Sequence, residues 1–224
     1  EQILSIAVGA ADTMMVSSAG EAAVSAVSLV DNVFVLLINL FAALATGGAV
    51  ISGQYLGRKR PDVAQKAAEQ LILFTAVFSV LIMALTYFFR SFILNVVFGK
   101  IEADVMSGCT AYLMIVAASI PFIALYNTGA ALFRAMGDSR TAMFTALFMN
   151  GINLVGNSIL IFGLKMGVAG AAIPTLISRI AAAILILALL RNPNKIIHVS
   201  IPFPLRFDFP LLKKILGIGI PNGL

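Results

Sequence analysis

Charged residues are scarce in this chain of 224 residues: they make up 11% of it, whereas 60% of the residues are hydrophobic. A soluble domain usually has a charged share of roughly 25%. The mean hydropathy is +1.02, and a soluble fold of this composition would leave large apolar patches in contact with water. In a bilayer, the outer faces of helices contact lipid instead. The composition therefore predicts a membrane protein.

Cysteine and histidine are almost absent, with one residue of each. Cys109 alone excludes an internal disulfide, and we expect it to be a small packing residue. His198 lies in a polar segment, where one histidine cannot form a metal site. The sequence has no phosphate-binding glycine loop, no nucleophile elbow and no His/Cys cluster. These absences argue against an enzyme with catalytic residues and against a bound cofactor.

Six apolar runs approach the length of about 20 residues that a helix needs to cross a bilayer. They cover residues 3–16, 26–55, 71–89, 109–128, 142–162 and 168–190. The chain begins at Glu1 and ends at Leu224 inside apolar runs, so we expect both end helices to be incomplete. The sequence predicts an all-α membrane fold, with a six-helix transmembrane lobe at 1–190. Residues 191–210 hold four prolines and are expected to form a linker, and residues 211–224 to begin a seventh helix.

Basic residues are concentrated in alternate gaps between the apolar runs. The gaps after the second, fourth and sixth runs hold eleven Lys and Arg residues, and those after the third and fifth hold three. This arrangement is typical of membrane topology signals and not of a nucleic-acid-binding face, despite the net charge of +5. It predicts a multi-pass protein of the cell (inner) membrane, with the N-terminus and the linker in the cytoplasm.

Three ionisable residues lie inside apolar runs, where such groups are costly and usually face a cavity or a partner. Asp12 is a candidate for taking up a proton or, with nearby amide oxygens, a sodium ion; the alternative is an aspartate at a helix end. Asp31 either lines the same cavity or lies in a solvated outer mouth. Arg179, in the middle of the sixth run, is expected to have a structural role with a helix end, carbonyl groups or a carboxylate as partner.

Three amides of the fifth run, Asn150, Asn153 and Asn157, are spaced to share one helical face. Amides in a membrane helix need polar partners. They either form hydrogen bonds between helices or face Asp12 and complete an ion site. Thr175 is placed to add a hydroxyl group to that site. No other metal site is expected.

Prolines inside the apolar runs, at positions 121, 174 and 221, each remove a backbone hydrogen bond and can bend a helix. Bends suit a transporter that rocks between two states. Static membrane helices contain proline as well, so both interpretations stay open.

Several short motifs occur in a fixed order along the chain. They are ADTMMV at 11–16, GQYLG at 53–57, FRAMGDSRT at 133–141, NLVGN at 153–157, GVAGAA at 167–172 and GIGIP at 217–221. Together they resemble the multidrug and toxic compound extrusion (MATE) family. The resemblance implies a twelve-helix exporter of two six-helix lobes that exchanges drugs or other organic compounds for protons or sodium ions. This chain then corresponds to the N-terminal lobe and the start of helix seven.

The resemblance also implies roles for individual residues. In the family, the first-helix aspartate and polar residues of helix five form a cation or proton site. These match Asp12, Asn153 and Asn157 here, and Thr175 matches a helix-six hydroxyl. Some branches of the family have an aspartate where this chain has Asn157, which leaves Asp12 as the main titratable group.

The leading hypothesis is therefore an antiporter for drugs or organic cations that works by alternating access. The coupling ion is a proton or sodium, and the partners are a small organic substrate, the bilayer and a second lobe, with no nucleic acid. A flippase for lipid-linked precursors is an alternative, although it should show more basic residues in its cavity. A channel or a structural membrane subunit is a further alternative, against which the clustered amides argue.

Overall fold

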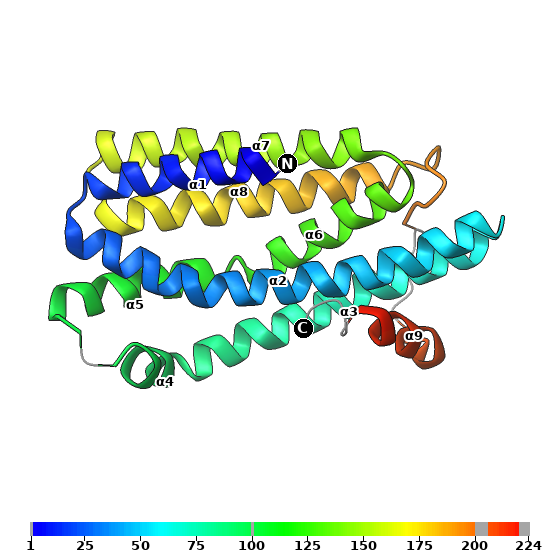
Figure 1. Ribbon diagram of the computed structural model, residues 1–224, viewed down its shortest axis with the longest axis horizontal. Coiled ribbons are helices and arrows are strands. Elements are labelled where there is room, and N and C mark those ends of the chain that lie inside the picture. Colours follow the sequence, from blue (N-terminus) through cyan, green and yellow to red (C-terminus); the bar gives the residue numbers. More distant parts are fainter. Residues whose placement is uncertain (1, 100, 200–205, 220–224) are drawn as a thin grey trace. The chain divides into compact units, whose positions relative to one another are not determined.

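The computed structural model describes residues 2–99, 101–199 and 206–219; within them, the side chains of residues 2–8, 12 and 219 lie outside the description. Pro221 is also outside it. Every described element is a helix (Figure 1). The elements are α1 (Gln2–Ser17), α2 (Glu21–Gly57), α3 (Pro61–Phe88), α4 (Arg90–Phe92), η1 (Ile93–Val97), α5 (Ala103–Ala117), α6 (Ile120–Ala135), α7 (Ser139–Asn157), η2 (Ser158–Gly163), α8 (Gly167–Leu190) and α9 (Phe209–Gly219).

Among the described residues, four helices are long and apolar enough to cross a membrane: α2, α3, α7 with η2, and α8. The bent pair of α5 and α6 makes a fifth span if the two are counted together. The predicted all-α membrane fold is confirmed. The first apolar run is the 16-residue helix α1, which is shorter than the length of about 20 residues that spanning requires.

The fourth apolar run was predicted to be one helix over residues 109–128, but the structure has two helices there. It consists of α5 and α6, which meet at an angle of 49°. Pro121 follows the first residue of α6 and cannot donate a backbone hydrogen bond to the preceding turn. Ser119 closes the break, because its backbone N–H donates to the Val116 carbonyl at 2.9 Å. A bend therefore lies beside Pro121, which does not decide between a moving and a static role for this proline.

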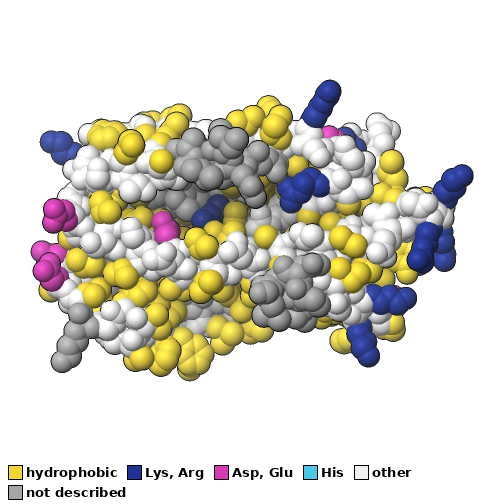
Figure 2. Space-filling model, viewed as in Figure 1, with side chains coloured by type: hydrophobic (Ala, Val, Ile, Leu, Met, Phe, Trp, Pro, Cys, Tyr) yellow, Lys and Arg dark blue, Asp and Glu magenta, His cyan; other side chains and the backbone are white. Residues whose placement is uncertain are grey.

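Large apolar side chains remain exposed along the spanning helices. Leu36 of α2 is 70% exposed, and Phe88 of α3 is 79% exposed. Figure 2 shows hydrophobic side chains over much of the visible surface. Lipid contact accounts for these faces, because a bilayer imposes no cost on apolar surface.

The helices divide into two compact units. Unit 1 comprises Glu1–Leu36, Leu81–Ile120 and Ala146–Ala181, and unit 2 comprises Leu37–Val80, Pro121–Thr145 and Ala182–Leu224. Helices α2, α3, α6, α7 and α8 contribute residues to both. The proposed division into a lobe, a linker and the start of a further helix stays a prediction.

Small residues bring pairs of helices in unit 1 into close contact. A Cβ atom at Gly108 of α5 would lie 2.8 Å from the Cβ of Ala26 in α2, and the Cys109 thiol points at the Ala26 carbonyl with an S···O distance of 3.7 Å. A Cβ atom at Gly156 of α7 would lie 2.7 Å from Cβ of Pro174 in α8. These close approaches decide which polar side chains of the neighbouring turns can meet.

In unit 2, the segment between α8 and α9 is anchored at two places. Lys195 Nζ lies 2.6 Å from Asp138 Oδ2, and Asp138 also accepts a hydrogen bond from the backbone N–H of Thr141 in the first turn of α7. The Lys195 ammonium and the Thr141 hydroxyl hold the pKa of Asp138 below its ordinary value. Farther along, the Gln70 side chain of α3 donates to the Arg206 carbonyl at 2.7 Å and accepts from the Asp208 N–H at 2.8 Å.

Candidate functional site

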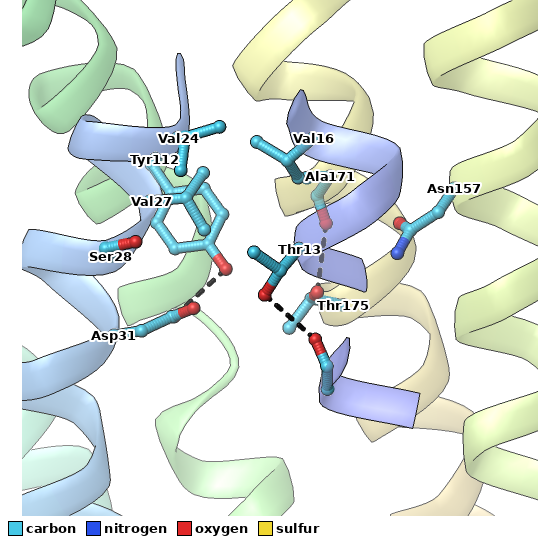
Figure 3. A pocket seen from close by; sticks show the side chains of 11 residues that line it. Thr13, Val16, Val24, Val27, Ser28, Asp31, Tyr112, Asn157, Ala171 and Thr175 are labelled. Carbon is cyan, nitrogen blue, oxygen red and sulfur yellow. Dashed lines mark hydrogen bonds between the residues drawn. The ribbon is translucent and has the colours of Figure 1, made fainter. Parts of the chain in front are cut away.

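A pocket of about 120 Å³ lies within unit 1. Five helices line it with a mixture of polar and small apolar side chains (Figure 3). Its lining is Gly9, Thr13 and Val16 of α1, Val24, Val27, Ser28 and Asp31 of α2, Tyr112 of α5, Asn157 of α7, and Ala171 and Thr175 of α8. An ionisable residue within a spanning helix, such as Asp31 of α2, is rare and usually functional, so this pocket is the candidate site.

Amide and hydroxyl groups of α7 and α8 form a chain of hydrogen bonds at one wall. The Asn157 amide donates to Asn153 Oδ1 at 3.2 Å, and the Asn153 amide donates to Thr175 Oγ1 at 3.0 Å. Thr175 in turn donates to the Ala171 carbonyl at 2.9 Å. Asn153 and Asn157 are 6% and 1% exposed. The contact of α7 with α8 thus fixes three oxygen-bearing side chains next to the pocket.

Close packing between Gly156 and Pro174 makes this arrangement possible. Both residues lie directly beside the polar ones, since Gly156 precedes Asn157 and Pro174 precedes Thr175. A larger residue at position 156 would push the helices apart. The spacing of Asn153 and Asn157 predicted their shared face. Asn150 is half-buried and is not part of the pocket lining.

Helix α1 forms another part of the lining. Thr13 points its hydroxyl at the Gly9 carbonyl at 2.9 Å, as expected for a threonine inside a helix (Figure 3). Met15 of the same helix receives a contact from the Ser158 hydroxyl, with an O···S distance of 3.9 Å. Asp12 belongs to α1, but its side chain lies outside the described part of the structure.

Asp31 of α2 is part of the pocket lining. Its Oδ1 accepts a hydrogen bond from the Tyr112 hydroxyl at 3.1 Å (Figure 3). Tyr112 is 4% exposed and lies four residues after Gly108, on the face of α5 that approaches α2. Sequence reasoning missed Tyr112, although a phenol in an apolar run usually has a hydrogen-bond partner.

Arg179 of α8 has its partner at the break between α5 and α6. Its Nη1 donates to Ser119 Oγ at 2.7 Å, and Ser119 Oγ donates to the Val116 carbonyl at 2.6 Å. Ser119 is fully buried. The expectation of a helix-end partner for Arg179 therefore agrees with this contact, since Ser119 directly precedes α6.

Comparison with known proteins places these features in a family. A family model described as MatE matches residues 1–159. The uncharacterised transporter YisQ of Bacillus subtilis is 31% identical over 96% of this chain and 47% of its own length. The multidrug export protein MepA of Staphylococcus aureus is 27% identical over 88% of this chain and 43% of its own length.

Solved structures show the same fold. An outward-facing MATE transporter of the MOP superfamily has a TM-score of 0.86 at 25% identity, covering 99% of this chain and 49% of its own length. An inward-facing structure has a TM-score of 0.84 at 25% identity, covering 96% of this chain and 49% of its own length. This chain spans about half the length of the curated relatives it matches.

Proteins of the MATE family are transporters and not enzymes; they are ion-coupled and bind small molecules. The described helices fit this class, because they form an all-α membrane fold around a polar pocket. The match over residues 1–159 covers more than half of the sequence, and this chain belongs to the MATE family of multi-pass membrane transporters.

Proposed function

We propose that this chain is the cation-binding half of a secondary active exporter that moves drugs or other organic cations out of the cell by alternating access. Entry of protons or sodium ions drives the export. The observation that carries this proposal is the pocket of unit 1, in which Asn157 and Thr175 of two spanning helices lie beside the lining face of α1.

Asp12 is the proposed coupling carboxylate. Gly9, Thr13 and Val16 line the pocket, and position 12 is three residues after Gly9 and four before Val16. This register belongs to the same side of an α-helix. Small hard cations bind through oxygen ligands, and Asn153, Asn157 and Thr175 supply the neighbouring oxygens in the proposal.

The distribution of basic residues supports the proposed orientation. Eleven of the fifteen Lys and Arg residues belong to unit 2, and four to unit 1. By the positive-inside rule, the loops of unit 2 face the cytoplasm.

The proposed substrate class rests on the family and on the relatives. MepA is named a multidrug export protein, and YoeA of Bacillus subtilis, 28% identical over 92% of this chain, a probable multidrug resistance protein. We propose that a second lobe completes the exporter, because this chain covers about half of each relative.

The test is uptake of a fluorescent organic cation into inverted vesicles that contain the full-length protein. Proton and sodium gradients are imposed separately, and wild type is compared with Asp12→Asn at equal protein level. Asp104→Asn is the matched control, because Asp104 is an exposed aspartate in the first turn of α5.

Loss of gradient-driven uptake in Asp12→Asn but not in Asp104→Asn supports the proposal, and the effective gradient identifies the ion. Equal uptake by all three proteins would show that coupling does not depend on Asp12. If wild type moves no cation under either gradient, multidrug export is refuted, and transport of a lipid-linked precursor becomes the next hypothesis to assay.

A further inference from the structure

An acid and a base from different spanning helices are held by the same segment of unit 1. Tyr112 of α5 donates a hydrogen bond to Asp31 of α2. Ser119, which directly follows α5 and its C-cap, accepts a hydrogen bond from Arg179 of α8. Positions 112 and 119 are seven residues apart along the chain, with Ser119 at the break that follows α5. The segment 112–119 therefore connects α2 to α8 through one negative and one positive group.

The two charges act on each other. Asp31 accepts a hydrogen bond from the neutral Tyr112 hydroxyl, and the negative charge of Asp31 and the positive charge of Arg179 attract each other. Asp12, a further titratable group of α1, has its side chain outside the described part of the structure. An isolated charge among spanning helices is costly to bury, whereas the mutual attraction and the hydrogen bonds of two opposite charges offset part of that cost.

Asp31 is open to the pocket while Arg179 is not. Asp31 belongs to the pocket lining with Thr13, Ser28 and Thr175. Arg179 lies one turn beyond Thr175 on α8, and its guanidinium is directed to Ser119 at the α5–α6 break. A proton or cation in the pocket can therefore reach Asp31, while Arg179 acts on it from behind the lining.

We propose that Asp31 is a second coupling carboxylate of this pocket and that Arg179 is its positioning residue. This inference rests on the proposed function. While Asp31 is negative, its attraction to Arg179 holds α2 and α8 against the segment 112–119. When a proton or cation binds Asp31, that attraction weakens and the α5–α6 break becomes less firmly held to α8. Binding in the pocket is thereby linked to the one sharp bend between the described spans.

The first experiment measures the pair without any transport. The full-length protein and its variants Asp31→Asn, Arg179→Gln and the double variant are purified in detergent, and their thermal unfolding is compared in a double-mutant cycle. Each single variant leaves one charge without its counterpart and should unfold at a lower temperature than wild type. The double variant should recover part of that loss, whereas additive losses would overturn the pairing.

The second experiment measures the pH dependence of cation uptake. Removing the positive charge in Arg179→Gln makes Asp31 easier to protonate, so the pH of half-maximal uptake should rise. Arg179→Lys keeps the charge and should retain the wild-type profile. Tyr112→Phe removes the hydroxyl that donates to Asp31 with nearly unchanged volume, and should shift the profile in the same direction as Arg179→Gln.

These outcomes separate this inference from the proposed function. An unchanged pH profile in both Arg179→Gln and Tyr112→Phe would show that Arg179 is a structural residue only. If wild type transports no cation, the proposed export fails, and the double-mutant cycle still decides whether Asp31 and Arg179 are coupled. Asp12→Asn tests the proposed function alone, because Asp12 is not needed for the pairing.

Discussion

Gly156 is where a single methyl group should disturb the site most directly. In Gly156→Ala, the new Cβ would lie 2.7 Å from Cβ and 3.0 Å from Cγ of Pro174. A proline ring cannot swing away as a flexible side chain does, so α7 and α8 must separate locally. Adding a methyl group to a packed site costs about 1–3 kcal/mol, and the separation should lengthen the Asn153–Thr175 hydrogen bond of 3.0 Å.

Gly151→Ala provides the matched control for this change. Gly151 lies in the same helix, and an added Cβ there meets nothing within 4 Å. Both variants gain the helix propensity of alanine, worth about 1 kcal/mol, so this gain cancels in the comparison. The difference between their free energies of unfolding should therefore be about 1–3 kcal/mol.

The assay is unfolding of the two full-length variants in detergent, together with cation uptake into vesicles. We expect Gly156→Ala to be less stable than Gly151→Ala and to transport more slowly at equal protein level. Equal stability with wild-type uptake in both variants would refute the argument that the close contact of α7 with α8 sets the geometry of the site.

Three further predictions concern single contacts. Thr175→Val removes the oxygen that accepts the Asn153 hydrogen bond and should lower the free energy of unfolding by about 0.5–1.5 kcal/mol, with Thr175→Ser near wild type in the same measurement. Because the folded-state pKa of Asp138 is lowered, its contact with Lys195 should be present above the ordinary carboxyl pKa range and be lost as the pH falls below about 4. Hydrogen exchange of residues 192–199, measured from neutral to acidic pH, checks this expectation. Loss of protection already near neutral pH would contradict it. Gln70→Ala removes both hydrogen bonds to residues 206 and 208 and should speed proteolysis just before α9, whereas the exposed Gln54→Ala should leave the cleavage rate unchanged.

Much of the helical arrangement could be predicted from the sequence, because lipid exposure requires long continuous apolar runs. The run at 168–190 corresponds to α8 (Gly167–Leu190) within one residue, and the run at 142–162 lies inside α7 and η2. The fourth run was wrong in its start and in its continuity. Residues 103–108 are too polar to count as a span by composition, yet they form the first part of α5.

Spacing within one helix predicted one part of the site, and the resemblance to the family suggested Thr175 as its neighbour. The four-residue spacing of Asn153 and Asn157 indicates one face, and their hydrogen bond follows from it. The contact of Asp31 with Tyr112 depends on how closely α2 approaches α5, which the small residues Ala26 and Gly108 allow. Sequence spacing within one helix carries no information about such a meeting between two helices.

The wide turn after α7 has a consequence for aligning relatives with this chain. In η2 (Ser158–Gly163), hydrogen bonds reach back five residues, as from the Leu164 N–H to the Ile159 carbonyl at 3.0 Å. Such a turn holds one residue more than the same turn of an α-helix, and it is often found beside functional residues. Relatives that continue this helix without the wide turn should therefore show a one-residue deletion just after the position of Asn157. A gap there in an alignment marks a change of backbone winding. The polar face that precedes the gap stays in register.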